Sequence, residues 1–171
     1  FIDSLFTATS ATCVTGLVVH DTFQYWSLFG QVVILCLIQV GGLGFMTVAT
    51  MFSLAFRRKI GLNERNLMRE ASNTMHIGGV VRLTRHVLVG TFVIEGVCAV
   101  LLAVRFCPDM GFGTGVYFAI FHSVSAFCNA GFDLMGGRTG AFSSLSGYTG
   151  DPVVCFVIMF LIVMGGIGFL V

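Results

Sequence analysis

Three long apolar runs divide the chain. Residues 22–56 and 152–171 contain no charged side chain, and residues 87–104 contain only Glu95. A helix that crosses a bilayer needs about 20 predominantly apolar residues. The runs therefore predict three membrane-spanning helices, at about residues 26–56, 80–105 and 152–171.

Two further apolar segments are too short to cross a bilayer. Residues 1–12 and about 114–127 each lead into a tetrapeptide that ends in glycine and is followed by a polar loop. Segments of this length inside a membrane protein are typical of re-entrant pore helices. We expect Asp3 or Ser4 to cap the first of these helices and Thr114 to cap the second.

The two short segments are copies of one pattern. Residues 6–17 read FTATSATCVTGL and residues 121–132 read FHSVSAFCNAGF, 115 positions apart. A second match, QVGGLGFM at 39–46 and VMGGIGFL at 163–170, is offset by 124 positions, and the stretch 136–150 can hold the additional residues. Two predicted spans separate the copies, so both glycine loops enter the membrane from one side. The repeat is therefore parallel rather than inverted.

Composition supports a membrane protein. Hydrophobic residues make up 56% of the chain and charged residues 10%, and the mean hydropathy is +0.95. A soluble domain carries roughly 25% charged residues. A secretory signal peptide is disfavoured, because no basic segment precedes an apolar stretch at Phe1. The missing methionine and the apolar run that continues to Val171 indicate a piece of a longer protein.

The placement of charges predicts the orientation. Seven of the nine basic residues lie between the apolar runs 22–56 and 87–104, namely Arg57, Arg58, Lys59, Arg65, Arg69, Arg82 and Arg85. The positive-inside rule assigns this segment to the cytoplasm. The aspartates at 21, 109, 133 and 151 then face the outside. Residues 63–71 of the basic segment have a helix-forming composition behind an Asn cap.

The glycine loops have the chemistry that a cation pathway needs. A dehydrated cation requires oxygen ligands in place of water, and backbone carbonyls supply them without fixed charge. Adjacent carbonyls point the same way only in unusual backbone conformations, which Gly16 and Gly131 tolerate. The C-terminal end of each pore helix adds partial negative charge. Asp21 and Asp133, just outside, are expected to raise the local cation concentration.

Four motifs in order resemble the Trk/Ktr/HKT superfamily of potassium transporters. They are SATCVTGLVVHDT at 10–22, IQVGGLGFM at 38–46, FHSVSAFCNAGFD at 121–133 and GGIGF at 165–169. The linker RRKIGLNER at 57–65 is most similar to that of a bacterial KtrB-type subunit of the TrkH family. The resemblance extends over essentially the whole chain.

The resemblance implies an all-α polytopic membrane protein with a potassium-channel-like fold. In that fold, parallel repeats of outer helix, re-entrant pore helix, filter strand and inner helix surround one pore. Residues 1–56 correspond to the end of the first repeat, 57–79 to a cytoplasmic linker and 80–171 to the second repeat. The third and fourth repeats, which hold the family's gating elements, have no counterpart in this sequence. The filter strands fall on Cys13, Val14, Thr15 and Gly16, and on Cys128, Asn129, Ala130 and Gly131.

The function implied is potassium uptake across the plasma membrane by the ion-conducting subunit. The resemblance further implies a homodimer in the lipid bilayer, bound to a cytosolic nucleotide-binding ring of the KtrA or TrkA type. We expect no cofactor beyond the transported potassium ion, with sodium as a possible stimulant, and no nucleic-acid partner. Cysteine at positions 13 and 128, where many relatives carry other small residues, leaves the preference between cations open.

Several polar residues in apolar segments have ordinary structural interpretations. Glu95 is expected to be a carboxyl paired within the helix bundle, with ion relay as the alternative. Arg105 is expected to extend toward lipid headgroups rather than pair with Glu95, and His122 to be a neutral packing residue rather than a metal ligand. The cysteines show no metal-binding spacing and are interpreted as small packing residues, without a disulfide between Cys13 and Cys128.

Three alternatives to potassium uptake stay open at this point. A transporter of sodium or another monovalent cation fits the same loops. An intramembrane enzyme using Ser10, Ser125, His122 or Cys128 is disfavoured, because Ser125 and His122 have no orienting acid nearby in sequence. A purely structural assembly subunit would not need the repeated glycine loops.

Overall fold

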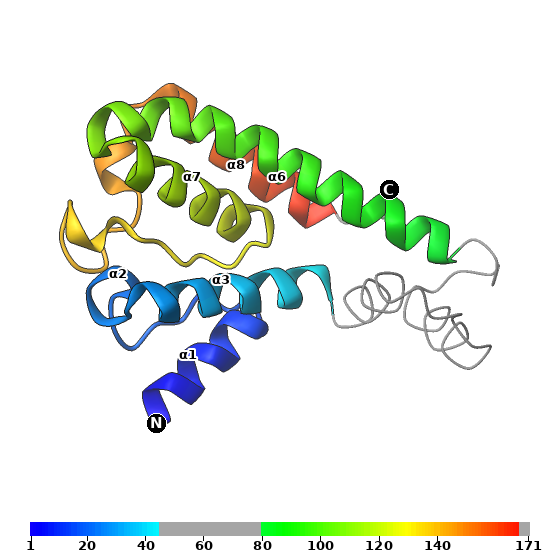
Figure 1. The fold of residues 1–171 in the computed structure, drawn as a ribbon, viewed down its shortest axis with the longest axis horizontal. Helices are drawn as coiled ribbons and strands as arrows, with labels where there is room; N and C mark the ends of the chain where they lie inside the picture. The colour runs from blue at the N-terminus through cyan, green and yellow to red at the C-terminus, as the bar shows by residue number, and fades with distance from the viewer. Residues whose placement is uncertain (45–79, 168–171) are drawn as a thin grey trace. The chain divides into compact units, whose positions relative to one another are not determined.

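The computed structural model describes residues 1–44 and 80–167, and for 80–84 the backbone only (Figure 1). The described residues are all-helical, without a β-strand, as expected for the fold class. The chain forms two compact units, Phe1–Gly42 with Ile94–Val171, and Leu43–Val93. Both glycine loops belong to the first unit.

Three apolar helices overlap the predicted spans, but the first ends at Leu43, before Gly44 with φ 79°, and does not continue unbroken toward residue 56. They are α3 (Leu28–Leu43), α6 (Val80–Met110) and α8 (Pro152–Ile167). Among the described helices, only the Arg85–Met110 part of α6 is long and apolar enough to cross a membrane, while α3, α7 and α8 are shorter apolar helices. The predicted continuation of the first span to residue 56, the linker 57–79 and the end of the last span lie outside the described residues.

The two short predicted helices are present as α1 (Ile2–Thr12) and α7 (Phe112–Phe127). The predicted caps were wrong, because Asp3 and Thr114 lie inside these helices, as does Ser4, and no side chain caps either N-terminus. Gly111, with φ 82°, instead turns the chain directly from α6 into α7. Gly115 permits this tight junction, since a Cβ there would lie 2.7 Å from the Cα of Cys107.

The core of the first unit surrounds α7. Phe118, Phe121, Phe127 and the following Phe132 are almost fully buried, and α7 packs against α8. In Figure 1, α7 and the loop after it run between α3 and α8. The two glycine loops therefore rest on a packed interior rather than on the surface of one helix.

Polar contacts join the C-terminal part of α6 to the start of α8. The Asp151 side chain accepts hydrogen bonds from the first amides of α8 and forms an ion pair with Arg105, whose Nε lies 2.7 Å from Asp151 Oδ2. This ion pair corrects the expectation that Arg105 is directed to lipid headgroups. The hydrogen bond from Arg105 lowers the pKa of Asp151 below its ordinary value. The helix α6 continues beyond Arg105 to Met110.

Candidate functional site

The two glycine loops have the same backbone conformation. Each follows a helix whose C-cap, Cys13 or Cys128, stays in the right-handed region. The next residues, Val14 and Asn129, have φ values of 56° and 57°, and Gly16 and Gly131 have φ values of 73° and 74°. The positive φ values therefore fall at equivalent positions of the two loops, so the sequence repeat is also a repeat of backbone conformation.

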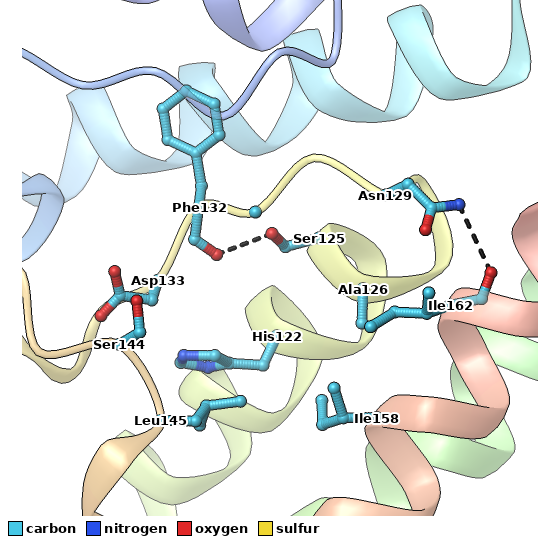
Figure 2. A pocket seen from close by; sticks show the side chains of 11 residues that line it. His122, Ser125, Ala126, Asn129, Phe132, Asp133, Ser144, Leu145, Ile158 and Ile162 are labelled. Carbon is cyan, nitrogen blue, oxygen red and sulfur yellow. Dashed lines mark hydrogen bonds between the residues drawn. The ribbon is translucent and has the colours of Figure 1, made fainter.

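Val14 is the unusual member of this set. A β-branched residue with positive φ is strained, whereas asparagine adopts this conformation readily. Asn129 at the equivalent position also donates a hydrogen bond from its side chain to the carbonyl of Ile162 in α8, at 3.5 Å (Figure 2). Both loops therefore have the same backbone conformation, which is strained for Val14 and not for Asn129. Strained backbone conformations of this kind are common at functional sites.

The amides of both loops are tied back to their helices in the same way. Thr15 N donates to Ser10 O at 3.0 Å, and the equivalent Ala130 N donates to Ser125 O at 2.8 Å. Val14 N and Asn129 N likewise donate to the carbonyls of residues 11 and 126. By contrast, no donor among the described residues reaches the carbonyl oxygens of residues 13–16 or 128–131. The described part of the structure therefore leaves these carbonyl oxygens available as acceptors.

The two loops lie side by side. A Cβ on Gly16 would be only 2.6 Å from the carbonyl oxygen of Ala130, and a Cβ on Gly131 would be 3.8 Å from the Cα of Gly16. Side-chain hydroxyls support each loop, although with different partners. Ser10 bonds to the Thr15 hydroxyl at 2.8 Å, and Ser125 donates to the Phe132 carbonyl at 2.6 Å (Figure 2).

The second sequence repeat also has a structural role. Gly41 in α3 lies against the carbonyl of Thr12, the last residue of α1, so closely that a Cβ would overlap the oxygen. Gly165 in α8 lies in the same way against the carbonyl of Phe127, the last residue of α7. Sequence reasoning found this repeat but not its contacts. The first glycine of each pair allows α3 or α8 to receive the C-terminal end of α1 or α7.

A cavity of about 280 Å³ opens behind the second loop (Figure 2). His122 lines it, and its two ring nitrogens have backbone partners. Nδ1 lies 2.7 Å from the carbonyl of Phe118, and Nε2 accepts the amide of Leu134 at 3.4 Å. Nδ1 must therefore carry the proton, and the ring is neutral. His122 is a satisfied packing residue, as predicted.

The two aspartates near the loops have different surroundings. Asp21 is buried, and its carboxylate accepts the amides of Phe23 and Gln24 at the start of α2 (Thr22–Tyr25). It also accepts the amide of Phe142, in the loop that precedes α8, at 3.0 Å. Asp21 thus ties the segment after the first loop to a distant loop, while its expected role in attracting cations stays a prediction. Asp133 is half-buried, and burial raises its pKa above the ordinary value, helped by the nearby charge of Asp21.

The remaining candidate residues have plain surroundings. Glu95 is buried and accepts a hydrogen bond from Gln39 at 3.2 Å, as expected for a carboxyl paired within the bundle. Within the described ranges, no group of three or more His, Cys, Asp or Glu side chains is placed to hold a metal ion. The six cysteines are free thiols. Cys98 and Cys128 are buried, and Cys13 and Cys36 are exposed.

Comparisons with a family model and with individual relatives agree on one protein family. A family model described as "TrkH: Cation transport protein" matches residues 1–171. The Ktr system potassium uptake protein B of Bacillus subtilis is 47% identical over 171 residues, which is 100% of this chain and 37% of that protein. The potassium/sodium uptake protein NtpJ of Enterococcus hirae is 43% identical, with the same coverage of both chains.

A third relative is the Ktr system potassium uptake protein B of Vibrio alginolyticus, 40% identical over 99% of this chain and 36% of that protein. The chain therefore spans little more than a third of the length of these curated relatives. The match over the whole chain agrees with the resemblance found from the four sequence motifs. The chain belongs to the TrkH family of cation transport proteins, which are membrane proteins and not enzymes.

Proposed function

We propose that this chain is part of the ion-conducting subunit of a potassium uptake system in the plasma membrane. One observation carries the proposal. Two adjacent loops at helix C-termini have most of their amides bonded to the preceding helix, no donor to their carbonyls among the described residues, and the same alternation of backbone conformation. Two of the relatives described above are named as potassium uptake proteins of Ktr systems, which supports potassium as the cargo.

In this proposal the carbonyl oxygens of Cys13, Val14, Thr15, Gly16, Cys128, Asn129, Ala130 and Gly131 replace the hydration shell of the ion. Carbonyl dipoles bind a cation without the fixed charge that would hold it too tightly for passage. The C-terminal ends of α1 and α7 contribute partial negative charge at the same place. An anion would meet only repulsion there.

The proposed organisation follows the parallel repeats. Residues 1–56 end one pore repeat, 57–79 form a cytoplasmic linker, and 80–171 make up the next repeat, in which α6, α7 and α8 serve as outer, pore and inner helix. The relatives' names refer to a Ktr system, which supports a transporter with more than one component. We extend the proposal to a homodimer that binds a cytosolic nucleotide-binding ring, with potassium as cargo and no cofactor.

A pathway for both potassium and sodium is the second candidate. The name of the Enterococcus hirae relative includes both ions. The proposal is tested with the complete subunit, expressed with its regulatory partner in a bacterium that lacks its own potassium uptake. We expect growth at limiting potassium, and potassium accumulation that exceeds sodium accumulation at equal external concentrations. Equal accumulation would favour the second candidate, and absence of any cation uptake would contradict both.

The proposed orientation predicts a labelling pattern. In intact cells, a membrane-impermeant thiol reagent should react with a cysteine introduced at Ser144 and not with one introduced at Asn66, because the positive-inside rule places the basic linker in the cytoplasm. The background protein has its reactive native cysteines replaced. Permeabilised cells, in which position 66 should become reactive, provide the control. Labelling of position 66 from outside would contradict the orientation.

A further inference from the structure

Glu95 occupies a junction between three helices. It lies in α6, and only 4% of its surface is exposed. Its carboxylate accepts a hydrogen bond from the side-chain amide of Gln39 in α3 at 3.2 Å. Its backbone carbonyl accepts a second hydrogen bond, from the Ser123 hydroxyl in α7 at 2.8 Å. A single residue therefore joins the helix that follows the first glycine loop to the helix that precedes the second.

Both partners of Glu95 are close to the glycine loops. Gln39 lies two residues before Gly41, which receives the C-terminal carbonyl of α1. It lies three residues before Gly42, where a Cβ would overlap the Cys128 side chain of the second loop. Ser123 lies in the last turns of α7, which ends at Phe127. A shift of α3 against α6 would therefore move one loop relative to the other.

A carboxyl group inside a membrane protein is costly to bury and is a candidate for function by default. Its hydrogen bond with Gln39 links residues 56 positions apart, from two different repeats. The contact between the loops themselves, Gly16 against Ala130, consists of backbone atoms. Behind the loops, the Tyr117 hydroxyl of α7 also donates to the Gln31 side chain of α3 at 3.1 Å. The spacing of the two carbonyl rows thus depends on the helices behind them.

We propose that the Glu95–Gln39 hydrogen bond sets the spacing between the two glycine loops, and that Glu95 is a positioning residue for cation selectivity. The inference rests on the proposed function, because it assigns the loops to the ion pathway. The hydrogen bond between the Glu95 carboxylate and the Gln39 amide does not involve a loop residue. Glu95 would therefore affect the loops only through the positions of α3 and α7. Its effect should appear in the preference between ions more than in the amount of folded protein.

The test measures the ratio of sodium to potassium uptake by the complete subunit, normalised to the amount of protein in the membrane. Glu95→Leu and Gln39→Leu each remove the hydrogen bond and should raise this ratio about tenfold. The double variant should be no worse than either single variant, because both remove the same interaction. Glu95→Gln retains an acceptor and should stay close to wild type. The exchange of Gln39→Glu with Glu95→Gln should restore the ratio to within about threefold of wild type.

Val97→Ala is the matched control, since Val97 lies on the same helix with 57% of its surface exposed. It should leave the ratio unchanged. If Glu95→Leu fails to reach the membrane, Gln39→Leu and the exchange variant decide the question. An unchanged ratio in Gln39→Leu, or an exchange variant no better than the single leucine variants, would overturn the inference. Gly131→Asp, measured in parallel, separates the two proposals. If it loses selectivity while Gln39→Leu does not, the inference about Glu95 is wrong and the proposed function stands.

Discussion

Replacing Gly16 with serine in the complete subunit should abolish the preference for potassium over sodium, and should do so more severely than the same replacement at Gly131. Both glycines have a positive φ, where a Cβ costs about 1–2 kcal/mol. At Gly16 the Cβ would also lie 2.6 Å from the carbonyl oxygen of Ala130. At Gly131 the nearest atom would be the Cα of Gly16 at 3.8 Å, an ordinary contact.

The comparison separates two physical effects at equivalent positions of the repeat. Gly131→Ser reports the backbone conformation alone, and Gly16→Ser adds crowding of a proposed ligand oxygen. Gly131→Asp adds a negative charge and should reduce selectivity further. The measurement is the uptake of potassium and of sodium, each normalised to the amount of the protein in the membrane. Gly150→Ser is the control, because nothing lies within 4 Å of the Cβ that it adds. Unchanged discrimination in both Gly16→Ser and Gly131→Asp would remove these loops from the ion pathway.

The positions of the helices were largely predictable, because uncharged runs have few alternatives in a membrane protein. The predicted start and core of α6 agree with the structure, but the predicted end at Arg105 falls short of Met110. The prediction ends this span at the charge of Arg105, and the structure pairs that charge with Asp151, 46 residues later. A partner so distant in sequence leaves no local pattern.

The same limit applies to the start of α7. Side-chain capping favours Asp, Ser and Thr, and Thr114 was chosen on that basis. The helix instead begins where Gly111 takes a positive φ and Gly115 lets the helix lie against α6. Both glycines are visible in the sequence. Their effect depends on the close approach of α6, which local preferences do not contain.

The repeat indicated both glycine loops as the candidate site, and the structure gives them one backbone conformation. It did not show how the surrounding residues support them. Asp21 follows the first loop and was interpreted as a solvent-facing charge, whereas three amides converge on its carboxylate, one of them 121 residues away. The partner of Glu95 was also unknown. Contacts between repeats are three-dimensional, so a comparison of the repeats with each other does not reveal them.

Gly165 and its neighbour Gly166 allow a second strong prediction. A Cβ on Gly165 would overlap the carbonyl oxygen of Phe127, at the end of α7, whereas a Cβ on Gly166 would have nothing closer than the Asn129 side chain at 3.8 Å. Overpacking against a rigid backbone costs about 1–3 kcal/mol. The helix end that carries the second glycine loop must move if this atom is added.

We therefore expect Gly165→Ala to reduce potassium uptake by at least about tenfold, and Gly166→Ala to retain most of it. The two variants differ by one position in the same motif, so their hydrophobicity and helix propensity are matched. Uptake is measured as the initial rate in cells loaded with sodium and normalised to membrane protein. Gly41→Ala, which would overlap the Thr12 carbonyl at the equivalent place of the first repeat, should behave as Gly165→Ala does. Equal rates for Gly165→Ala and Gly166→Ala would show that the end of α7 need not touch α8, and that the proposed filter does not depend on this contact.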